Sequence, residues 1–159
     1  MKRFGNKKKI VILGKLETKY NAPFDDSSWE IWSMNKHDDA DLIPRVDVWF
    51  DIHEKPINKK ANVLKKDFPF DKCNALMGGM YFNNITSYLI ALACTLNAEE
   101  LALYGMRFVT DHAHRSLELE NVRQWLFFAK GRGIKVTIPC DKEFLLPEFK
   151  VETGKEYDQ

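Results

Sequence analysis

Two short apolar segments, each followed by a glycine, constrain the fold of this chain most strongly. The first is Lys9–Leu13 before Gly14, and the second is Leu101–Tyr104 before Gly105. Neither segment alternates apolar and polar residues, which is typical of strands buried on both faces of a parallel sheet. A glycine at the carboxyl end of such a strand lets the backbone turn sharply or approach a ligand closely. Because ligands of open α/β sheets bind at that edge, the sequence predicts a pocket there.

Three more strands are predicted between and after these two. Aromatic and β-branched residues favour strands at 29–34, 46–53 and 134–138. The polar composition of 15–28 favours turns and a loop long enough to fold over a ligand. A weaker signal favours a short helix at 59–66.

Two helices have clear signals. The apolar segment 88–96 predicts a buried helix that Asn97 ends in a left-handed conformation. Its cap is predicted among Asn84, Thr86 and Ser87. A second helix is predicted at 117–130, with Ser116 as its cap and glycines after its end.

The order of these elements predicts an α/β fold. Strand, strand, strand, helix, strand, helix, strand indicates a Rossmann-like three-layer fold with a mainly parallel sheet of about five strands. With 159 residues, the chain has the size of a single domain. Its basic lead-in, 1–8, and its polar tail, 150–159, are expected to be flexible.

Composition excludes several classes of function. Because 24 basic residues are balanced by 23 acidic ones, no overall electrostatic field draws the protein to nucleic acid or to an anionic membrane. No apolar stretch approaches the roughly 20 residues that span a bilayer, and the three cysteines have no CxxC spacing for a zinc knuckle or disulfide framework. We therefore expect a cytoplasmic protein with a small-molecule partner. Exposed strand edges would suit a homodimer.

The segment after the first strand offers a phosphate site without a standard motif. Gly14 and Lys15 begin neither GxGxxG nor GxxxxGK[ST], so a lysine that meets phosphate and a loop that faces solvent both remain open. The helix start at 83–87 also has two interpretations. Its free backbone N–H groups and hydroxyls would bind an anion or serve only as a cap.

Histidines and arginines after the strands suggest chemistry at the same edge. His53 lies beside Asp51, a pairing that suits general acid or base catalysis, although a histidine that only closes the sheet edge is the alternative. His112, in the loop after Gly105, is a second candidate for proton transfer. No further spacing of His, Asp or Glu supports a metal site. Arg107 and Arg115 would bind phosphate through their guanidinium groups.

The candidate site residues fall into two groups, and the sequence identifies neither a cofactor nor metal ligands. The candidate catalytic residues are His53 and His112. The candidate ligand-binding residues are Gly14, Lys15, Asn35, Asp51, Thr86, Ser87, Gly105, Arg107 and Arg115. Trp29, Trp32 and Trp49 would stack on a base or, as is commoner at strand spacing, belong to the core.

Two motifs, WEIWSM at 29–34 and WFDIH at 49–53, carry a family resemblance. Together with 12–14, 22–26 and the blocks 103–106, 118–121 and 129–134, they resemble a group of small bacteriophage proteins with a Rossmann-like fold. The resemblance covers most of the chain and implies a host cytoplasm during infection. The chain carries Arg107 where those proteins have Asp, and Glu118-Leu119-Glu120 where they have Gln-Arg-Pro. More distantly, the helix before Leu103-Tyr104-Gly105 resembles the nucleotide-sugar-binding half of bacterial sialyltransferase-like enzymes.

Three functions follow from these observations. The leading hypothesis is a protein that binds a nucleotide or nucleotide-sugar at the carboxyl edge of the sheet, with glycosyl transfer or nucleotide cleavage as the expected reaction. The second is a non-enzymatic sponge that sequesters a host signalling nucleotide. The third is an accessory protein of nucleic-acid modification, which the balanced charge disfavours.

Overall fold

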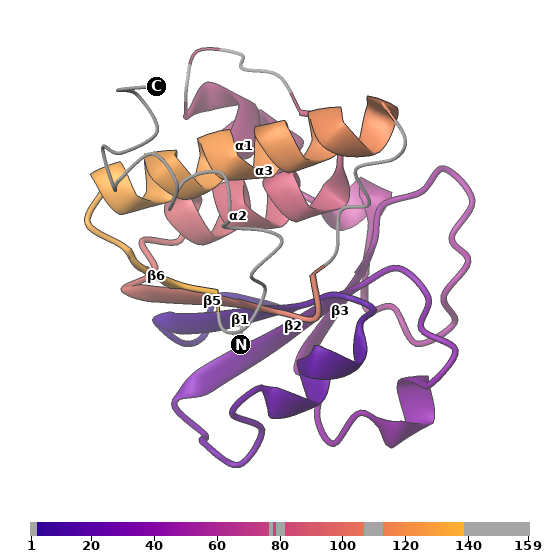
Figure 1. Cartoon of the computed structure of the whole chain (residues 1–159). Coiled ribbons are helices and arrows are strands. Elements are labelled where there is room, and N and C mark those ends of the chain that lie inside the picture. Colours follow the sequence, from indigo (N-terminus) through magenta and orange to yellow (C-terminus); the bar gives the residue numbers. More distant parts are fainter. Residues whose placement is uncertain (1–2, 77, 79–81, 107–112, 139–159) are drawn as a thin grey trace, which may run out of the picture.

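The computed structural model describes residues 3–76, 78, 82–106 and 113–138, and within these it shows an α/β fold with a parallel sheet (Figure 1). All six strands are parallel, in the order β4-β3-β2-β1-β5-β6. The strands are β1 (Lys9–Leu13), β2 (Trp29–Met34), β3 (Val48–Asp51), β4 (Val63–Leu64), β5 (Glu100–Tyr104) and β6 (Lys135–Thr137). The predicted Rossmann-like fold is therefore confirmed, with one short strand, β4, beyond the five expected.

The two faces of the sheet are covered differently. The α-helices lie together on one face (Figure 1) and are α1 (Phe70–Ala75), α2 (Ile85–Thr95) and α3 (Ala113–Gly131). The opposite face carries the 3-10 helices η1 (Glu17–Asn21) and η2 (Ala40–Leu42), whereas η3 (Lys65–Asp67) precedes α1. A separate apolar cluster packs between the sheet and the layer on each of its faces. Segments as polar as 15–28 lack the apolar stripe of an α-helix, so this third layer consists of 3-10 turns and loops.

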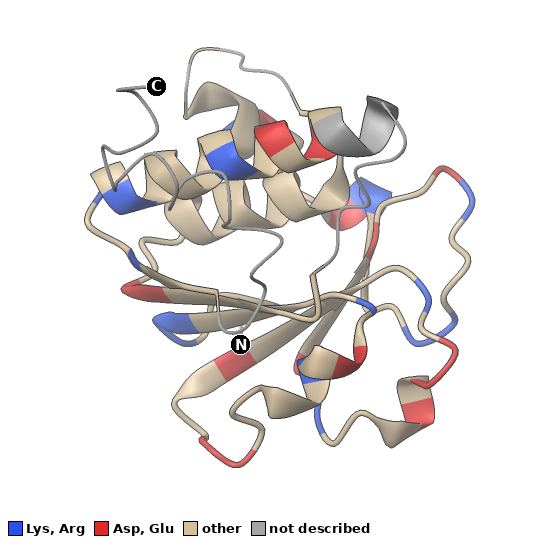
Figure 2. Ribbon diagram, in the orientation of Figure 1, with Lys and Arg blue, Asp and Glu red and all other residues tan. Residues whose placement is uncertain are grey.

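The apolar strands form the core as predicted. Ile10, Val11, Ile12 and Leu13 are fully buried, because β1 is central and both faces of the sheet are covered. Charged residues of both signs are interspersed over the loops and the outer face of α3 (Figure 2). In the described part of the chain, no helix is long and apolar enough to cross a membrane.

Between β3 and α2, one prediction is wrong and one helix was missed. The helix expected at 59–66 is replaced by β4 and the start of η3, because Val63 is fully buried and pairs with Phe50 in the sheet. Tertiary pairing of a β-branched residue thus prevails over a weak helical signal. The short helix α1 was not predicted, since it has only six residues and no capping side chain.

Two element ends also differ from the prediction. The strand expected at 46–53 is limited to Val48–Asp51. At its start the Asp47 carboxylate accepts the backbone N–H of Ile31 at 2.7 Å, and at its end the Asp51 carboxylate accepts the backbone N–H of His53 at 3.3 Å. Helix α3 begins at Ala113, so Ser116 lies inside the helix and is not its cap.

The ends of α2 agree with the sequence. Asn84 is the cap, and its side chain accepts the backbone N–H of Ser87 at 2.9 Å. Asn97 has a φ of 52°, the left-handed conformation that was predicted. Asn84 therefore fixes where the helix starts, at the carboxyl edge of the sheet, and Asn97 fixes where it ends.

The basic lead-in is attached to the sheet through a buried carboxylate. Glu30 is only 2% exposed, and it accepts the backbone N–H groups of Gly5, Asn6 and Lys7 at 3.0 to 3.3 Å. These three bonds explain how an acidic side chain is accommodated inside the central region of the sheet. The chain is thus hydrogen-bonded to the fold from residue 5 onward. The predicted polar tail, 150–159, lies outside the described residues.

Candidate functional site

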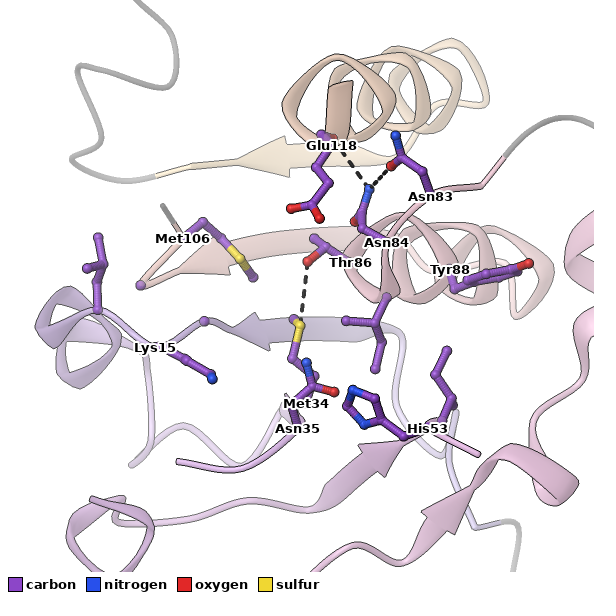
Figure 3. Close-up of a pocket in the computed structure, with 15 residues that line it drawn as sticks. Lys15, Met34, Asn35, His53, Asn83, Asn84, Thr86, Tyr88, Met106 and Glu118 are labelled. Carbon is purple, nitrogen blue, oxygen red and sulfur yellow. Dashed lines mark hydrogen bonds between the residues drawn. The ribbon is translucent and has the colours of Figure 1, made fainter. Parts of the chain in front are cut away.

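The strand order creates a switch point at the carboxyl ends of β1 and β5. From β1 the chain proceeds outward to β2, β3 and β4 on one side, and then crosses to β5 and β6 on the other. Loops that leave two neighbouring strands in opposite directions open a crevice between them. A cavity of about 600 Å³, here called the edge cavity, lies at this place (Figure 3). Its size suits a ligand as large as a nucleotide.

Gly14 and Gly105 are needed where two loops cross. The N–H of Gly14 donates to the carbonyl of Tyr104 at 2.7 Å, and the N–H of Leu16 donates to the carbonyl of Gly105 at 3.0 Å. A Cβ on Gly14 would lie 2.2 Å from the Gly105 carbonyl oxygen. Gly105 itself has a φ of 70°. Both glycines therefore have a structural role, in addition to lining the edge cavity.

A buried lysine holds the loop that carries Lys15. Lys19 is 1% exposed, and its amine donates to the carbonyl of Lys15 at 3.2 Å and forms an ion pair with Asp39 at 2.6 Å. Hydrogen bonds from Lys19 and Tyr20 lower the pKa of Asp39 to about 2. The bond to Asp39 in turn raises the pKa of Tyr20 to about 12. With its carbonyl fixed, Lys15 extends its amine toward Asn35 (Figure 3).

Asn35 follows β2 and turns its side chain to the cavity. Its φ is 56°, a conformation that asparagine tolerates better than most residues. Its backbone carbonyl accepts both the Trp49 indole N–H at 2.6 Å and the Asn58 amide at 2.8 Å. Because the backbone is held on both sides, the Asn35 amide is positioned as part of the cavity wall.

His53 and Asp51 form a hydrogen-bonded pair at the carboxyl end of β3. Asp51 is fully buried, and its carboxylate lies 2.6 Å from Nδ1 of His53. It also accepts the N–H groups of Ile57 and Asn58 at 2.7 and 2.8 Å. Burial by itself would raise the pKa of Asp51, but these hydrogen bonds outweigh it and the pKa is lowered. A carboxylate that accepts from Nδ1 leaves Nε2 with a lone pair, the arrangement that a general base requires.

The start of α2 forms the opposite wall. Ile85 and Thr86 occupy the first helical turn, where backbone N–H groups have no partner within a helix and carry the positive end of its dipole. The Thr86 hydroxyl contacts Sδ of Met34 at 3.5 Å (Figure 3). Asn84 donates to Oγ of Ser87 at 3.0 Å, so Ser87 serves the cap. This wall offers two backbone amides to an anion.

The structure brings six of the eleven candidate residues together around the edge cavity. These are Gly14, Lys15, Asn35, His53, Thr86 and Gly105. Asp51 and Ser87 lie behind the wall and support its residues. Arg107 and His112 lie outside the described residues. Arg115 belongs to α3, but its side chain is also outside the part that the structure describes.

Two further polar side chains that line the same cavity, Asn83 and Glu118, are not among the candidate site residues, although Asn83 belongs to the helix start at 83–87 named above. Glu118 comes from α3, and Asn83 immediately precedes the α2 cap (Figure 3). Both α2 and α3 are crossover helices and so begin at the carboxyl edge of the sheet, which is the signal that would have found them. The apolar part of the lining was also missed and consists of Leu16, Met34, Ile52, Ile85, Tyr88 and Met106.

Tryptophan and cysteine side chains belong to the packing. Trp32 is fully buried and Trp49 is 6% exposed, and neither lines the edge cavity. Burial raises the pKa of Cys73 to about 12 and that of Cys94 to about 11, so neither thiol is an activated nucleophile. Among the described residues, no three His, Cys, Asp or Glu side chains are grouped as metal ligands.

Comparisons with known proteins give a distant structural similarity. No protein-family model matches this chain, and no curated protein sequence does so either. A crystal structure of the sialyltransferase CST-II in complex with trisaccharide acceptor and CMP is 15% identical, covers 83% of this chain and 81% of its own, and has a TM-score of 0.46. The Y81F form of CST-II in complex with CMP is 16% identical, covers 89% and 84%, and has a TM-score of 0.49. Both scores lie below 0.5, so the site described above rests on its own geometry.

Proposed function

We propose that this protein binds a nucleotide-sugar in the edge cavity and acts on the bond between the sugar and the phosphate. One observation carries the proposal. Gly14, Lys15, Gly105, the start of α2 and His53 surround a single cavity at the switch point of a parallel sheet. Phosphate-bearing ligands bind at such points, where helix N-termini and loop amides meet the charge.

Charge in the cavity favours one orientation of the ligand. Lys15 is the lysine that lines the wall, and among the described residues its amine has no ion-pair partner. Phosphate oxygens would lie between Lys15 and the amides of Ile85 and Thr86. Asn83 and Glu118 line the other part of the wall and would accept or donate hydrogen bonds to ribose or base.

His53 is the group that would move a proton in this site. It lines the edge cavity, and the fully buried Asp51 holds its Nδ1 at 2.6 Å. The ring is thereby oriented, and Nε2 is available to take a proton from the oxygen that attacks the sugar. Asp51 acts through the ring and is a positioning residue.

Ligand affinity tests the binding half of this proposal. Titration calorimetry with AMP, CMP, GMP, UMP and UDP-glucose should find a ligand whose affinity falls about tenfold in Lys15→Met, because a charge-assisted bond to phosphate is lost. Lys130→Met is the control, since Lys130 is exposed in the last turn of α3, away from the edge cavity. Equal affinities in both variants and the parent would contradict the proposed phosphate position.

Turnover separates an enzyme from a sponge that only captures a nucleotide. His53→Gln should keep the affinity for the ligand found above and lose its cleavage, measured as release of free nucleotide. Binding that stays tight in a parent protein without any turnover would favour the sponge. Binding of a duplex DNA fragment with a steep salt dependence would instead favour the nucleic-acid function.

The sequence motifs that resemble phage proteins bear on the cellular setting of this activity. A phage protein with this site would act on a nucleotide-sugar in the host cytoplasm, and this remains part of the proposal.

A further inference from the structure

A second cavity shares His53 with the edge cavity. This outer cavity has a volume of about 560 Å³ and is lined by the turn after β3 and by the β4-η3-α1 segment. His53 is the residue common to the two linings. A proton-accepting ring that lies between two cavities, each large enough for a sugar or a nucleoside, is suited to a reaction between two bound molecules.

One wall of the outer cavity is fixed by the same carboxylate that orients His53. Asp51 accepts the N–H groups of Ile57 and Asn58 at 2.7 and 2.8 Å, which closes the turn containing Glu54 and Pro56. The position of this wall relative to the imidazole is therefore set by one buried group. A ligand held against the wall would keep a defined distance from Nε2.

The other wall is cationic over an apolar floor. Lys65 and Lys66 line it together with Leu64 and Phe70. Lys65 forms an ion pair with Glu54, which also lines the cavity. Among the described residues, Lys66 has no ion-pair partner, so the lysines outnumber the carboxylates in the lining. A ligand of this cavity would therefore present both an apolar ring face and a negative charge.

We infer that the outer cavity binds the acceptor of the reaction, and that this acceptor is a sugar bearing a carboxylate or phosphate group. The inference rests on the proposed function, because it needs a glycosyl donor in the edge cavity. It makes the protein a transferase whose acceptor is anionic, and it assigns Lys65 and Lys66 to acceptor recognition.

His53, Lys15 and the start of α2 supply the groups that the transfer step needs. The acceptor hydroxyl gives its proton to Nε2 of His53 while its oxygen bonds to the anomeric carbon of the donor sugar. The bond from that carbon to the phosphate oxygen breaks, and the nucleotide leaves with the electron pair. Lys15 and the start of α2 line the edge cavity, in which this negative charge would develop.

Chemical shifts of backbone amides test the acceptor site directly. The full chain is titrated with glucose 6-phosphate, with glucuronic acid and with glucose as the neutral control. We expect the two anionic sugars to shift the amides of Glu54, Lys65 and Lys66, and glucose to bind about tenfold more weakly. Absence of these shifts up to 20 mM sugar, or equal binding of glucose, would overturn the inference.

A pair of variants shows whether the lysines recognise the charge. Lys66→Ser should weaken binding of the anionic sugars about tenfold, whereas Lys59→Ser changes an exposed lysine that lines neither cavity and should leave it unaltered. Equal effects of the two variants would contradict the assignment. Nucleotide binding, measured separately by calorimetry, fails only if the proposed function fails, so the two hypotheses are refuted by different results.

Discussion

Replacing Gly14 with alanine should separate the two loops that form the floor of the edge cavity. The added Cβ would lie 2.2 Å from the Gly105 carbonyl oxygen and 2.7 Å from its carbon, against an ordinary contact of 3.4 to 4 Å. These neighbours are backbone atoms, so no side-chain rotation relieves the clash. The β1 and β5 loops must therefore move apart by about 1 Å.

The expected cost of this movement follows from the bonds that join the loops. Two backbone hydrogen bonds, of 2.7 and 3.0 Å, cross between them and would be stretched beyond bonding distance. Each contributes roughly 1 kcal/mol net to stability, and the crowding itself costs roughly 1 kcal/mol or more. We expect the free energy of unfolding to fall by about 3 kcal/mol, which for a domain of this size lowers Tm by about 6 to 12 °C.

Urea denaturation followed by tryptophan fluorescence measures this loss. The matched control is Gly131→Ala, at the end of α3, where an added Cβ meets nothing within 4 Å. That change should stabilise the protein by up to about 1 kcal/mol or leave it unaltered. If Gly14→Ala and the parent unfold at the same urea concentration, the crossing of the loops does not require glycine and the reasoning is refuted.

Three further predictions concern polar side chains that hydrogen-bond within the fold. Because the pKa of Asp51 is lowered, its carboxylate stabilises the fold above its ordinary pKa of 3.8, and this contribution is lost as the pH falls below that value. A fall from pH 5 to pH 3 should therefore lower the free energy of unfolding, measured in urea, more in the parent than in Asp51→Asn, and parallel pH profiles would contradict this. Asn84→Ala should cost about 1 kcal/mol through loss of the α2 cap, whereas Asn84→Asp keeps an acceptor and should cost less in the same assay. Lys19→Met should raise the pKa of Asp39 from about 2 toward 3.8, as measured by carboxyl ¹³C titration, and an unchanged value would show that Tyr20 alone sets it.

The sheet and its functional edge could be predicted because their signals are local. Uninterrupted apolar residues in β1 and β5 identify strands buried on both faces, and a glycine after each marks the carboxyl edge. His53 and Asp51 were recognised as a pair because they are two residues apart at the end of a predicted strand. In each case, residues adjacent in the sequence carried the information.

The parts that could not be predicted depend on contacts between distant segments. β4 consists of two residues, too few to show any periodicity, and exists because Val63 pairs with Phe50. The glycines were predicted to allow a sharp turn or the close approach of a ligand. That each must also lack a side chain because the loop of the other passes so close is a contact that no local pattern shows. Glu118 joins the cavity only because α3 begins beside the start of α2.

A titration of the ¹⁵N-labelled protein with UDP-glucose and the four nucleoside monophosphates would test the central claim most directly. Binding in the edge cavity predicts that at least one of them shifts the amides of Gly14, Lys15, Thr86 and Gly105 together, with a single dissociation constant. If all five compounds leave these four amides unmoved at millimolar concentration, or shift only amides on the face covered by η1 and η2, the edge cavity is not a nucleotide site.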